Sequence, residues 1–150
     1  MMEYLKVYLQ KIEGNEDLPL PSYMTEGAAG VDLCAAINQK VLLEINNRML
    51  FPTGIKVALP VGYEAQVRPR SGLALKHGVT VLNTPGTIDS DYRGEIKVIL
   101  INLGERSLEI NRGDRIAHMV IQRYQTVQFI ESGELPSTER NEGGFGHTGR

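Results

Sequence analysis

The hydrophobic and polar positions of this 150-residue chain follow the pattern of short β-strands separated by turns. Leu5-Lys6-Val7-Tyr8-Leu9, for example, alternates so that every second side chain lies on one face. A single short helix is predicted at residues 72–77, with Ser71 as its N-cap and Gly78 after its end. The pattern therefore predicts an all-β sandwich or barrel with one short helix. The expected strands are residues 5–9, 30–34, 41–45, 53–59, 63–67, 79–83, 95–103, 107–110, 115–123 and 127–130.

Composition narrows the class of protein further. With 41% hydrophobic and 23% charged residues, the chain is typical of one folded domain. A net charge of −2 argues against a broad nucleic-acid surface, which usually carries a strong basic excess. No apolar run reaches the roughly 18 residues of a membrane span, and the first residues lack the features of a signal peptide. We expect a cytoplasmic protein with neither a nucleic-acid nor a membrane partner.

The cysteine and histidine content excludes the common metal sites of those residues. Cys34 is the only cysteine, so neither an internal disulfide nor a cysteine-based zinc site is expected. The three histidines, at positions 77, 118 and 147, do not have the spacing of a histidine metal site.

The densest cluster of reactive side chains occupies residues 86–95, between two β-rich segments that we expect to pair as an extended hairpin. Asp89 can orient and deprotonate a water molecule, and Tyr92 offers a flat face to a ring or sugar. The alternative is an ordinary turn, since Asp, Ser and Gly favour turns for local reasons. A calcium loop starting at Asp89 is excluded, because Arg93 and Leu100 would occupy ligand positions.

A second candidate site is the run Arg68-Pro69-Arg70-Ser71-Gly72, which leads into the predicted helix. The Arg70 guanidinium, the Ser71 hydroxyl and the free N–H groups of the first helical turn could together hold a phosphate. The alternative is a capped turn with solvated arginines. Asp32, within the apolar run 30–34, either faces solvent or holds a metal-bound water.

Residues 140–150 differ in kind from the rest, because four glycines in seven positions preclude a stable helix or strand. We therefore divide the chain into a β domain, residues 1–139, and a flexible glycine-rich arm, residues 140–150. The arm is either a disordered tail or a segment that orders on a nucleotide, with Phe145 closing over a base. It lacks the Gly-Lys-Ser/Thr end of a Walker loop.

Five segments together resemble, in order, the five motifs of the trimeric dUTPases. They are Ala29-Gly30-Val31-Asp32-Leu33; residues 68–74; Asn83 with residues 86–95; Gly113-Asp114-Arg115-Ile116-Ala117-His118; and residues 140–149. The sequence departs from the family pattern at two positions. His118 stands where the fourth motif commonly has glutamine, and His147 stands where many members have serine. Since an imidazole can donate a hydrogen bond at either place, we expect activity to survive.

The resemblance implies a jelly-roll-like homotrimer with its sites at subunit interfaces. It further implies hydrolysis of dUTP to dUMP and pyrophosphate, which limits uracil incorporation into DNA and supplies dUMP for dTMP synthesis. Asp89 would activate the water that attacks the α-phosphorus. Magnesium would be held chiefly by the phosphates and by waters, with Asp32 as an outer-shell partner. The remaining implied substrate contacts are Asn83, Thr87 and Ile88 at uracil; Tyr92 under the deoxyribose; Arg70, Ser71 and Gly72 at the triphosphate; Lys97 near the nucleotide; and Arg140, Phe145, Gly146, His147 and Thr148 closing the site.

Two other functions stay open at this point. The sister family of dCTP deaminases shares the fold and resembles the second motif, but it needs a glutamate placed at the cytosine ring. A nucleotide sensor would bind dUTP without turnover. The apolar strand surfaces between residues 95 and 123 could face either a core or a subunit interface.

Overall fold

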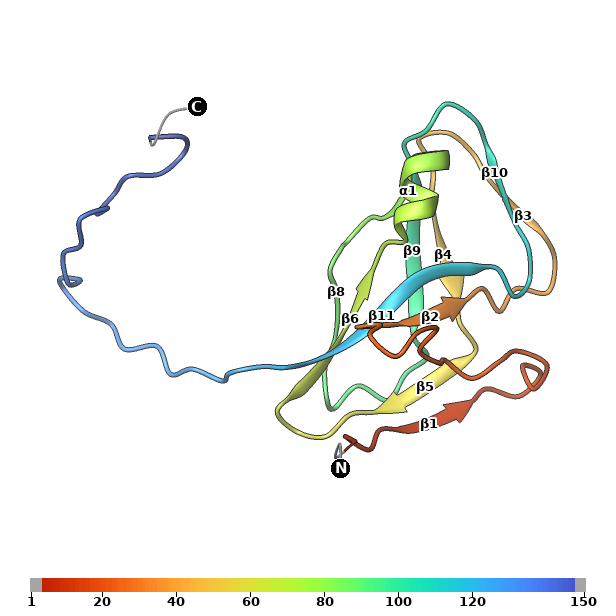
Figure 1. Cartoon of the computed structure of the whole chain (residues 1–150), viewed down its shortest axis with the longest axis horizontal. Coiled ribbons are helices and arrows are strands. Elements are labelled where there is room, and N and C mark those ends of the chain that lie inside the picture. The colour runs from red at the N-terminus through yellow and green to blue at the C-terminus, as the bar shows by residue number, and fades with distance from the viewer. Residues whose placement is uncertain (1–3, 148–150) are drawn as a thin grey trace.

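The computed structural model describes residues 4–147, which form strands in four antiparallel groups and one short helix (Figure 1). The largest sheet joins β2 (Val31–Cys34), β11 (Arg115–Arg123), β6 (Tyr63–Arg68) and β8 (Gly86–Ile88), in that order. A three-stranded sheet joins β4 (Arg48–Pro52), β9 (Lys97–Asn102) and β7 (Val79–Val81). Two ribbons pair β1 (Tyr8–Lys11) with β5 (Ile55–Ala58), and β10 (Leu108–Ile110) with β3 (Val41–Leu43). The prediction of a mostly β protein is confirmed, but the strands of residues 4–147 form no closed barrel.

The core lies between the sheets and is built from the side chains that face inward from the strands. In β9, Val98, Leu100 and Asn102 are buried, whereas Ile99 and Ile101 are half-buried on the opposite face. The apolar surface of this strand is therefore divided between the core and the outside. Buried Asn102 donates hydrogen bonds to two backbone carbonyls and accepts one from the Gly104 N–H, so its amide is fully used.

The helix α1 (Ser71–His77) forms where the sequence predicts it, with its N-cap one residue earlier than expected. Arg70, with an extended backbone, is the N-cap, and no side chain bonds the first turn. Gly78 ends the helix at a φ of 66° and accepts the left-handed conformation that favours glycine. A Cβ on Gly78 would also lie 2.5 Å from the Gly104 Cα, so two backbone segments can cross here only without a side chain.

The expected hairpin is confirmed, because β7 and β9 pair antiparallel from Val79 opposite Asn102 to Val81 opposite Leu100. The connection between them is not a single turn, however. Residues 86–88 of this connection form β8, which leaves this sheet and pairs with β6 of the large one. The anchor is Ile88, which is buried in the core while Thr87 beside it is exposed. Residues 86–95 are thus a strand followed by a turn.

Three other sequence expectations differ from the structure. The first strand begins later than predicted, at Tyr8, and β4 was not predicted. Three of the five residues of β4 are exposed, and its buried side chain, Phe51, stands next to Pro52, so no strand alternation is visible in the sequence. The strand expected at residues 127–130 was wrong, because these residues find no partner strand within residues 4–147.

After β11 the chain leaves the folded body as a long extended segment, residues 124–147, whose far end belongs to the predicted arm (Figure 1). Large apolar side chains on it are exposed to solvent: Val127, Phe129, Ile130, Leu135 and Phe145. In the described residues no helix has the length and apolar character needed to cross a bilayer.

Candidate active site

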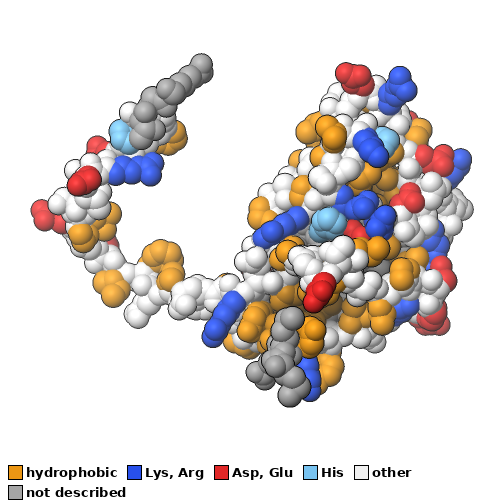
Figure 2. All heavy atoms as spheres, in the orientation of Figure 1, with side chains coloured by type: hydrophobic (Ala, Val, Ile, Leu, Met, Phe, Trp, Pro, Cys, Tyr) orange, Lys and Arg blue, Asp and Glu red, His pale blue; other side chains and the backbone are white. Residues whose placement is uncertain are grey.

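Asp32 lies at the centre of a cluster of basic side chains on the outer face of the large sheet. Pairing of β2 with β11 sets His118 directly opposite Asp32. The His118 Nε2 lies 2.9 Å and the Arg70 Nε 3.2 Å from Oδ1, while the Arg115 Nη1 donates a hydrogen bond to Oδ2 at 3.2 Å. Figure 2 shows blue lysine and arginine side chains gathered around a pale-blue histidine near the centre of the visible face of the folded body. Asp32 therefore faces neither open solvent nor the core, but a ring of cationic and imidazole groups.

The contact between Arg70 and Asp32 is an ion pair without a well-directed hydrogen bond. Both the Asp32 Oδ1 and the Arg70 Nε are buried, and neither has a hydrogen-bond partner of good geometry within residues 4–147. Arg70 instead uses its Nη1 to donate to the backbone carbonyl of Arg115 at 3.1 Å. The two positive charges of the arginines thus lie beside a single negative charge, that of Asp32. The excess positive charge would attract an anion.

The predicted phosphate segment is next to this cluster. Ser71 and Gly72 open α1 and are exposed, and a Cβ on Gly72 would meet nothing within 4 Å. Since Ser71 makes no capping bond, its hydroxyl and the first backbone N–H groups of the helix are available to a ligand.

Arg115 belongs to the cluster but was not among the predicted site residues. Its position within Gly113-Asp114-Arg115-Ile116-Ala117-His118 was the available signal. An irregularity in the β2–β11 register falls between Arg115 and Ala117, immediately before His118. We infer that this bulge brings both the Arg115 and the His118 side chains to Asp32.

Asp89 and Tyr92 lie in the turn after β8, where the Tyr92 N–H donates to the Asp89 carbonyl at 3.1 Å. Asp89 is exposed, and its carboxylate has no hydrogen bond or ion pair within residues 4–147. Arg93 fastens the turn by donating to the Ser90 and Tyr92 carbonyls at 2.7 and 2.9 Å. The turn therefore holds a free carboxylate on a fixed backbone.

The other predicted residues of this hairpin differ in their burial. Ile88 is a core residue, so only its backbone can reach a ligand. Asn83 and Thr87 are exposed, and the Asn83 Nδ2 would lie 3.2 Å from a Cβ on Gly86. Lys97 is exposed, and its Nζ lies 3.8 Å from the Glu95 Oε2. Its ion-pair partner therefore belongs to the same hairpin.

Asp32 and Asp89 occupy opposite corners of the same sheet. Asp32 is in the row of Arg68 on β6, whereas Ile88, just before Asp89, is opposite Ala65, three residues away along the same strand. β2 and β8 are also separated by two intervening strands. With a rise of about 3.3 Å per residue and a spacing of about 4.8 Å per strand, the two backbones are about 20 Å apart. One chain does not bring the basic cluster and the free carboxylate to one substrate.

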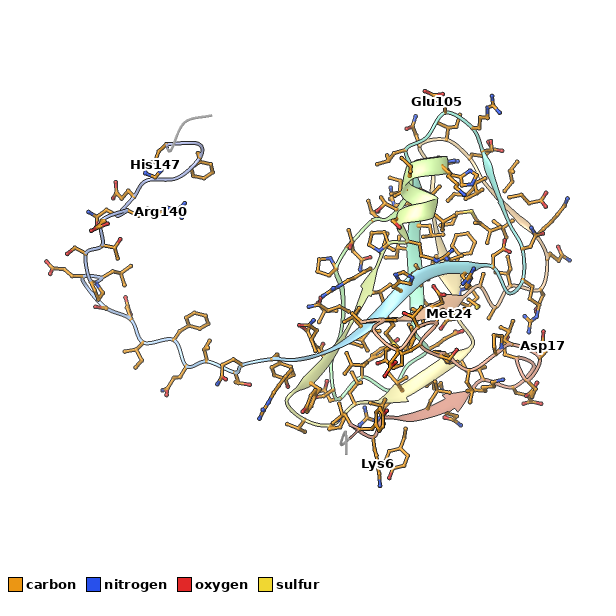
Figure 3. All side chains as sticks on the ribbon, in the orientation of Figure 1. Lys6, Asp17, Met24, Glu105, Arg140 and His147 are labelled. Atoms are coloured by element: carbon orange, nitrogen blue, oxygen red, sulfur yellow. The ribbon has the colours of Figure 1, made fainter. Side chains whose placement is uncertain are left out.

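The predicted arm residues lie far from both groups. Figure 3 shows Arg140 and His147 near the end of the arm, well away from the folded body. The Arg140 Nε donates to the Gly143 carbonyl at 2.7 Å, and the His147 N–H donates to the Gly144 carbonyl at 3.1 Å. Phe145 is fully exposed and Gly146 has a φ of 89°. The predicted Thr148 lies outside the described residues.

No group of three or more histidine, cysteine or acidic side chains within residues 4–147 could hold a metal ion. A lone carboxylate fits the outer shell of Mg²⁺, an ion that keeps much of its water. The buried Asp32 Oδ1, which lacks a well-directed donor, can accept a hydrogen bond from such a water. Since Arg70 and Arg115 would repel a bare cation, the fit requires phosphates to lie between them and the metal.

Cys34, at the end of β2 near Asp32, is a half-buried free cysteine. Burial and, secondarily, the negative charge of Asp32 raise the pKa of its thiol. We assign it a packing role.

These features define a β-sheet protein with two separated half-sites, one that attracts a polyanion and one that carries a free carboxylate. Comparisons with known proteins show to which family the chain belongs. The sequence model of the dUTPase family matches residues 16–149, so the chain belongs to the dUTPase family.

Individual relatives agree over nearly the whole chain. The deoxyuridine 5'-triphosphate nucleotidohydrolase of Thermoanaerobacter sp. (strain X514) is 57% identical over 141 residues, which cover 94% of this chain and 95% of that protein. Among solved structures, a variant of the Staphylococcus bacteriophage 80alpha dUTPase with dUpNHpp has a TM-score of 0.87, with 24% identity, 97% of this chain and 99% of that chain covered. A variant of the phage phi11 dUTPase of S. aureus, described with a structural Mg(II) ion, has a TM-score of 0.76 and 22% identity over 88% of this chain and 99% of that chain.

Proposed function

We propose that this chain hydrolyses dUTP to dUMP and pyrophosphate. The observation that carries the proposal is the 57% identity, over 94% of the chain, to a nucleotidohydrolase named for deoxyuridine 5'-triphosphate. The two half-sites supply the chemistry that this reaction needs. One is a free carboxylate on a rigid turn, and the other is a basic cluster that suits a triphosphate.

Asp89 acts as the general base. Its carboxylate takes a proton from a water molecule as the water oxygen forms a bond to the α-phosphorus, and the bond from that phosphorus to the bridging oxygen of the β-phosphate breaks. Because the Asp89 carboxylate has no hydrogen bond or ion pair within residues 4–147, both oxygens are available to orient the water. The products are dUMP and pyrophosphate.

The basic cluster holds the triphosphate. Arg70 and Arg115 would exchange part of their interaction with Asp32 for phosphate oxygens, and Ser71 and Gly72 would add a hydroxyl and backbone N–H groups. Asp32 would then accept hydrogen bonds from waters of a magnesium ion bound to the phosphates. The ion supplies neutralisation of the phosphate charge.

The hairpin selects the nucleoside. Asn83 and the backbone of Thr87 and Ile88 bind uracil, and the exposed face of Tyr92 packs under the deoxyribose without room for a 2′-hydroxyl. Two observations support this assignment: Ile88 is fixed in the core, and Tyr92 is 46% exposed. Lys97 lies on the strand that follows and assists at the nucleotide.

Completion of the site needs further copies of the chain, and we propose a jelly-roll-like homotrimer. The distance of about 20 Å across the sheet separates the cluster from Asp89, so each site would combine half-sites of different subunits. An outer patch on the β4–β9–β7 sheet, formed by Leu50, Leu82, Ile99 and Ile101, suits contact with a second copy.

The arm would close the site of a neighbouring subunit. It runs away from its own body and exposes apolar side chains that a neighbour can cover (Figure 1). Arg140, Phe145, Gly146, His147 and Thr148 would then complete the contacts with the substrate. The cytoplasmic location expected from the sequence stays a prediction.

The test is pyrophosphate release with Mg²⁺ from dUTP, dCTP, dTTP and UTP in parallel, together with the mass of the assembly from light scattering. We expect hydrolysis of dUTP alone and a mass of three chains. Ammonia release from dCTP would instead assign the chain to the deaminases, and binding of dUTP without turnover would leave a nucleotide sensor. A monomer with full activity would contradict the shared site.

A further inference from the structure

The Tyr92 ring is fastened at its hydroxyl end. The Oη donates a hydrogen bond to the Glu95 backbone carbonyl at 2.9 Å. The Glu95 side chain in turn accepts the Gly54 N–H at 2.9 Å, and the neighbouring Ile96 N–H donates to the Ile55 carbonyl at 2.9 Å. The carbonyl that holds the ring is therefore tied to the β4–β5 turn of the folded body.

Gly94 lies directly beneath this ring. A Cβ on Gly94 would lie 2.3 Å from the Tyr92 Oη and 2.5 Å from its Cζ. Gly94 does not have a positive φ, so alanine would fit its backbone, and the three atoms nearest to the added Cβ all belong to Tyr92. The absence of a side chain at this position leaves room for the hydroxyl end of the ring.

We propose that Gly94 is a positioning residue that sets the height of the Tyr92 ring and thereby the discrimination between deoxyribose and ribose. The inference rests on the proposed function of Tyr92 as the platform under the sugar. One side of the ring is packed on Gly94, and the hydroxyl is held by Glu95, so the ring cannot retreat from a bulkier sugar.

Substitution Gly94→Ala should displace the ring. Ordinary contacts begin at 3.4 Å, so a Cβ at 2.3 Å requires the Oη to move by about 1 Å (3.4 − 2.3). A displacement of this size near a reacting group can change the rate about a hundredfold. We expect the ratio of kcat/KM for dUTP to kcat/KM for UTP to fall at least about tenfold.

The experiment is a double-substitution cycle with Gly94→Ala, Tyr92→Ala and both together, with kcat and KM for dUTP and UTP measured for each. If Gly94 acts through the ring, Gly94→Ala changes the ratio in the native background and leaves it unchanged when Tyr92 is alanine. Tyr92→Phe, which keeps the ring and removes its hydrogen bond, should lower the ratio about fivefold. Gly27→Ala is the matched control, because a Cβ there meets nothing within 4 Å and the φ is not positive.

Three outcomes decide the proposal. An unchanged ratio in Gly94→Ala, with the melting temperature preserved, overturns it, as does an equal change in both backgrounds. If Gly94→Ala does not fold, the ratio for Tyr92→Phe decides, and a value equal to that of the native protein overturns the proposal. Failure of the proposed function looks different, because the unsubstituted protein would then release no pyrophosphate from dUTP.

Discussion

Replacement of Asp89 by asparagine tests the proposed catalytic base with little disturbance of the structure. The residue is exposed, its carboxylate has no partner within residues 4–147, and its backbone is held independently by the Tyr92 N–H and by the buried Ile88 before it. Asparagine has nearly the same size and can still bind water. The free energy of unfolding should therefore change by less than about 0.5 kcal/mol.

The substitution Asp89→Asn should lower kcat. General-base catalysis contributes about 10²- to 10⁴-fold to a rate, which corresponds to about 3–5.5 kcal/mol in the activation free energy. Because the amide cannot take the proton of the water, we expect kcat for Asp89→Asn to fall by this factor. The KM for dUTP should change by less than about threefold, since the proposed triphosphate contacts are at the other half-site.

The assay is pyrophosphate release over a range of dUTP concentrations, with thermal unfolding measured on the same samples. Asp91→Asn is the matched control, because it removes an equal charge from an exposed position in the same turn. A variant at Asp89 that keeps more than about a tenth of kcat would refute the base assignment. An equal loss at Asp91 would show that the charge of the turn matters rather than one carboxylate.

Three further predictions use other parts of the chain. Removal of residues 140–150 should lower turnover at least about a hundredfold with an unchanged melting temperature, and a truncated protein that is fully active would refute the role of the arm. Asn102→Leu should lower the free energy of unfolding in urea by about 2–4 kcal/mol, because two carbonyls and the Gly104 N–H lose their partner; a loss below about 1 kcal/mol would contradict this reasoning. Since burial raises the pKa of the Cys34 thiol, its reactive thiolate is scarcer at any pH below that pKa, and iodoacetamide at pH 7.5 should label the native protein far more slowly than the urea-unfolded one.

The strand pattern predicted most of the fold because it depends on local alternation. β2, β5 and β6 alternate between inward and outward side chains, and each was found close to its predicted place. β11 was also found where the sequence predicts it, although its buried residues come in adjacent pairs. Sheet partners depend on long-range pairing, which periodicity does not encode. For that reason β8 was read as part of a turn, although Ile88 joins it to β6.

The individual site residues could be proposed from the sequence, but their grouping could not. From the sequence, Asp32 could either face solvent or hold a metal-bound water. Only the pairing of β2 with β11 shows that His118 lies opposite it. Arg115 was missed because the bulge that accompanies its approach to Asp32 has no periodic signature. Gly94 drew no notice in the sequence because its importance lies in the space that the Tyr92 ring occupies.

In the proposed homotrimer, the separation of the two half-sites would make activity depend on subunit assembly. A chain with Asp89 and the arginine cluster at opposite corners of one rigid sheet cannot bring them together by moving a loop, since the strands between them belong to the core. In the proposed homotrimer, assembly would create the site, and the free energy of subunit contact would contribute to catalysis as well as to stability. An isolated chain would keep its anion-binding cluster and its free carboxylate but would not hydrolyse dUTP. Turnover should therefore depend on the concentration of assembled protein, with the arm acting only on sites that assembly has already formed.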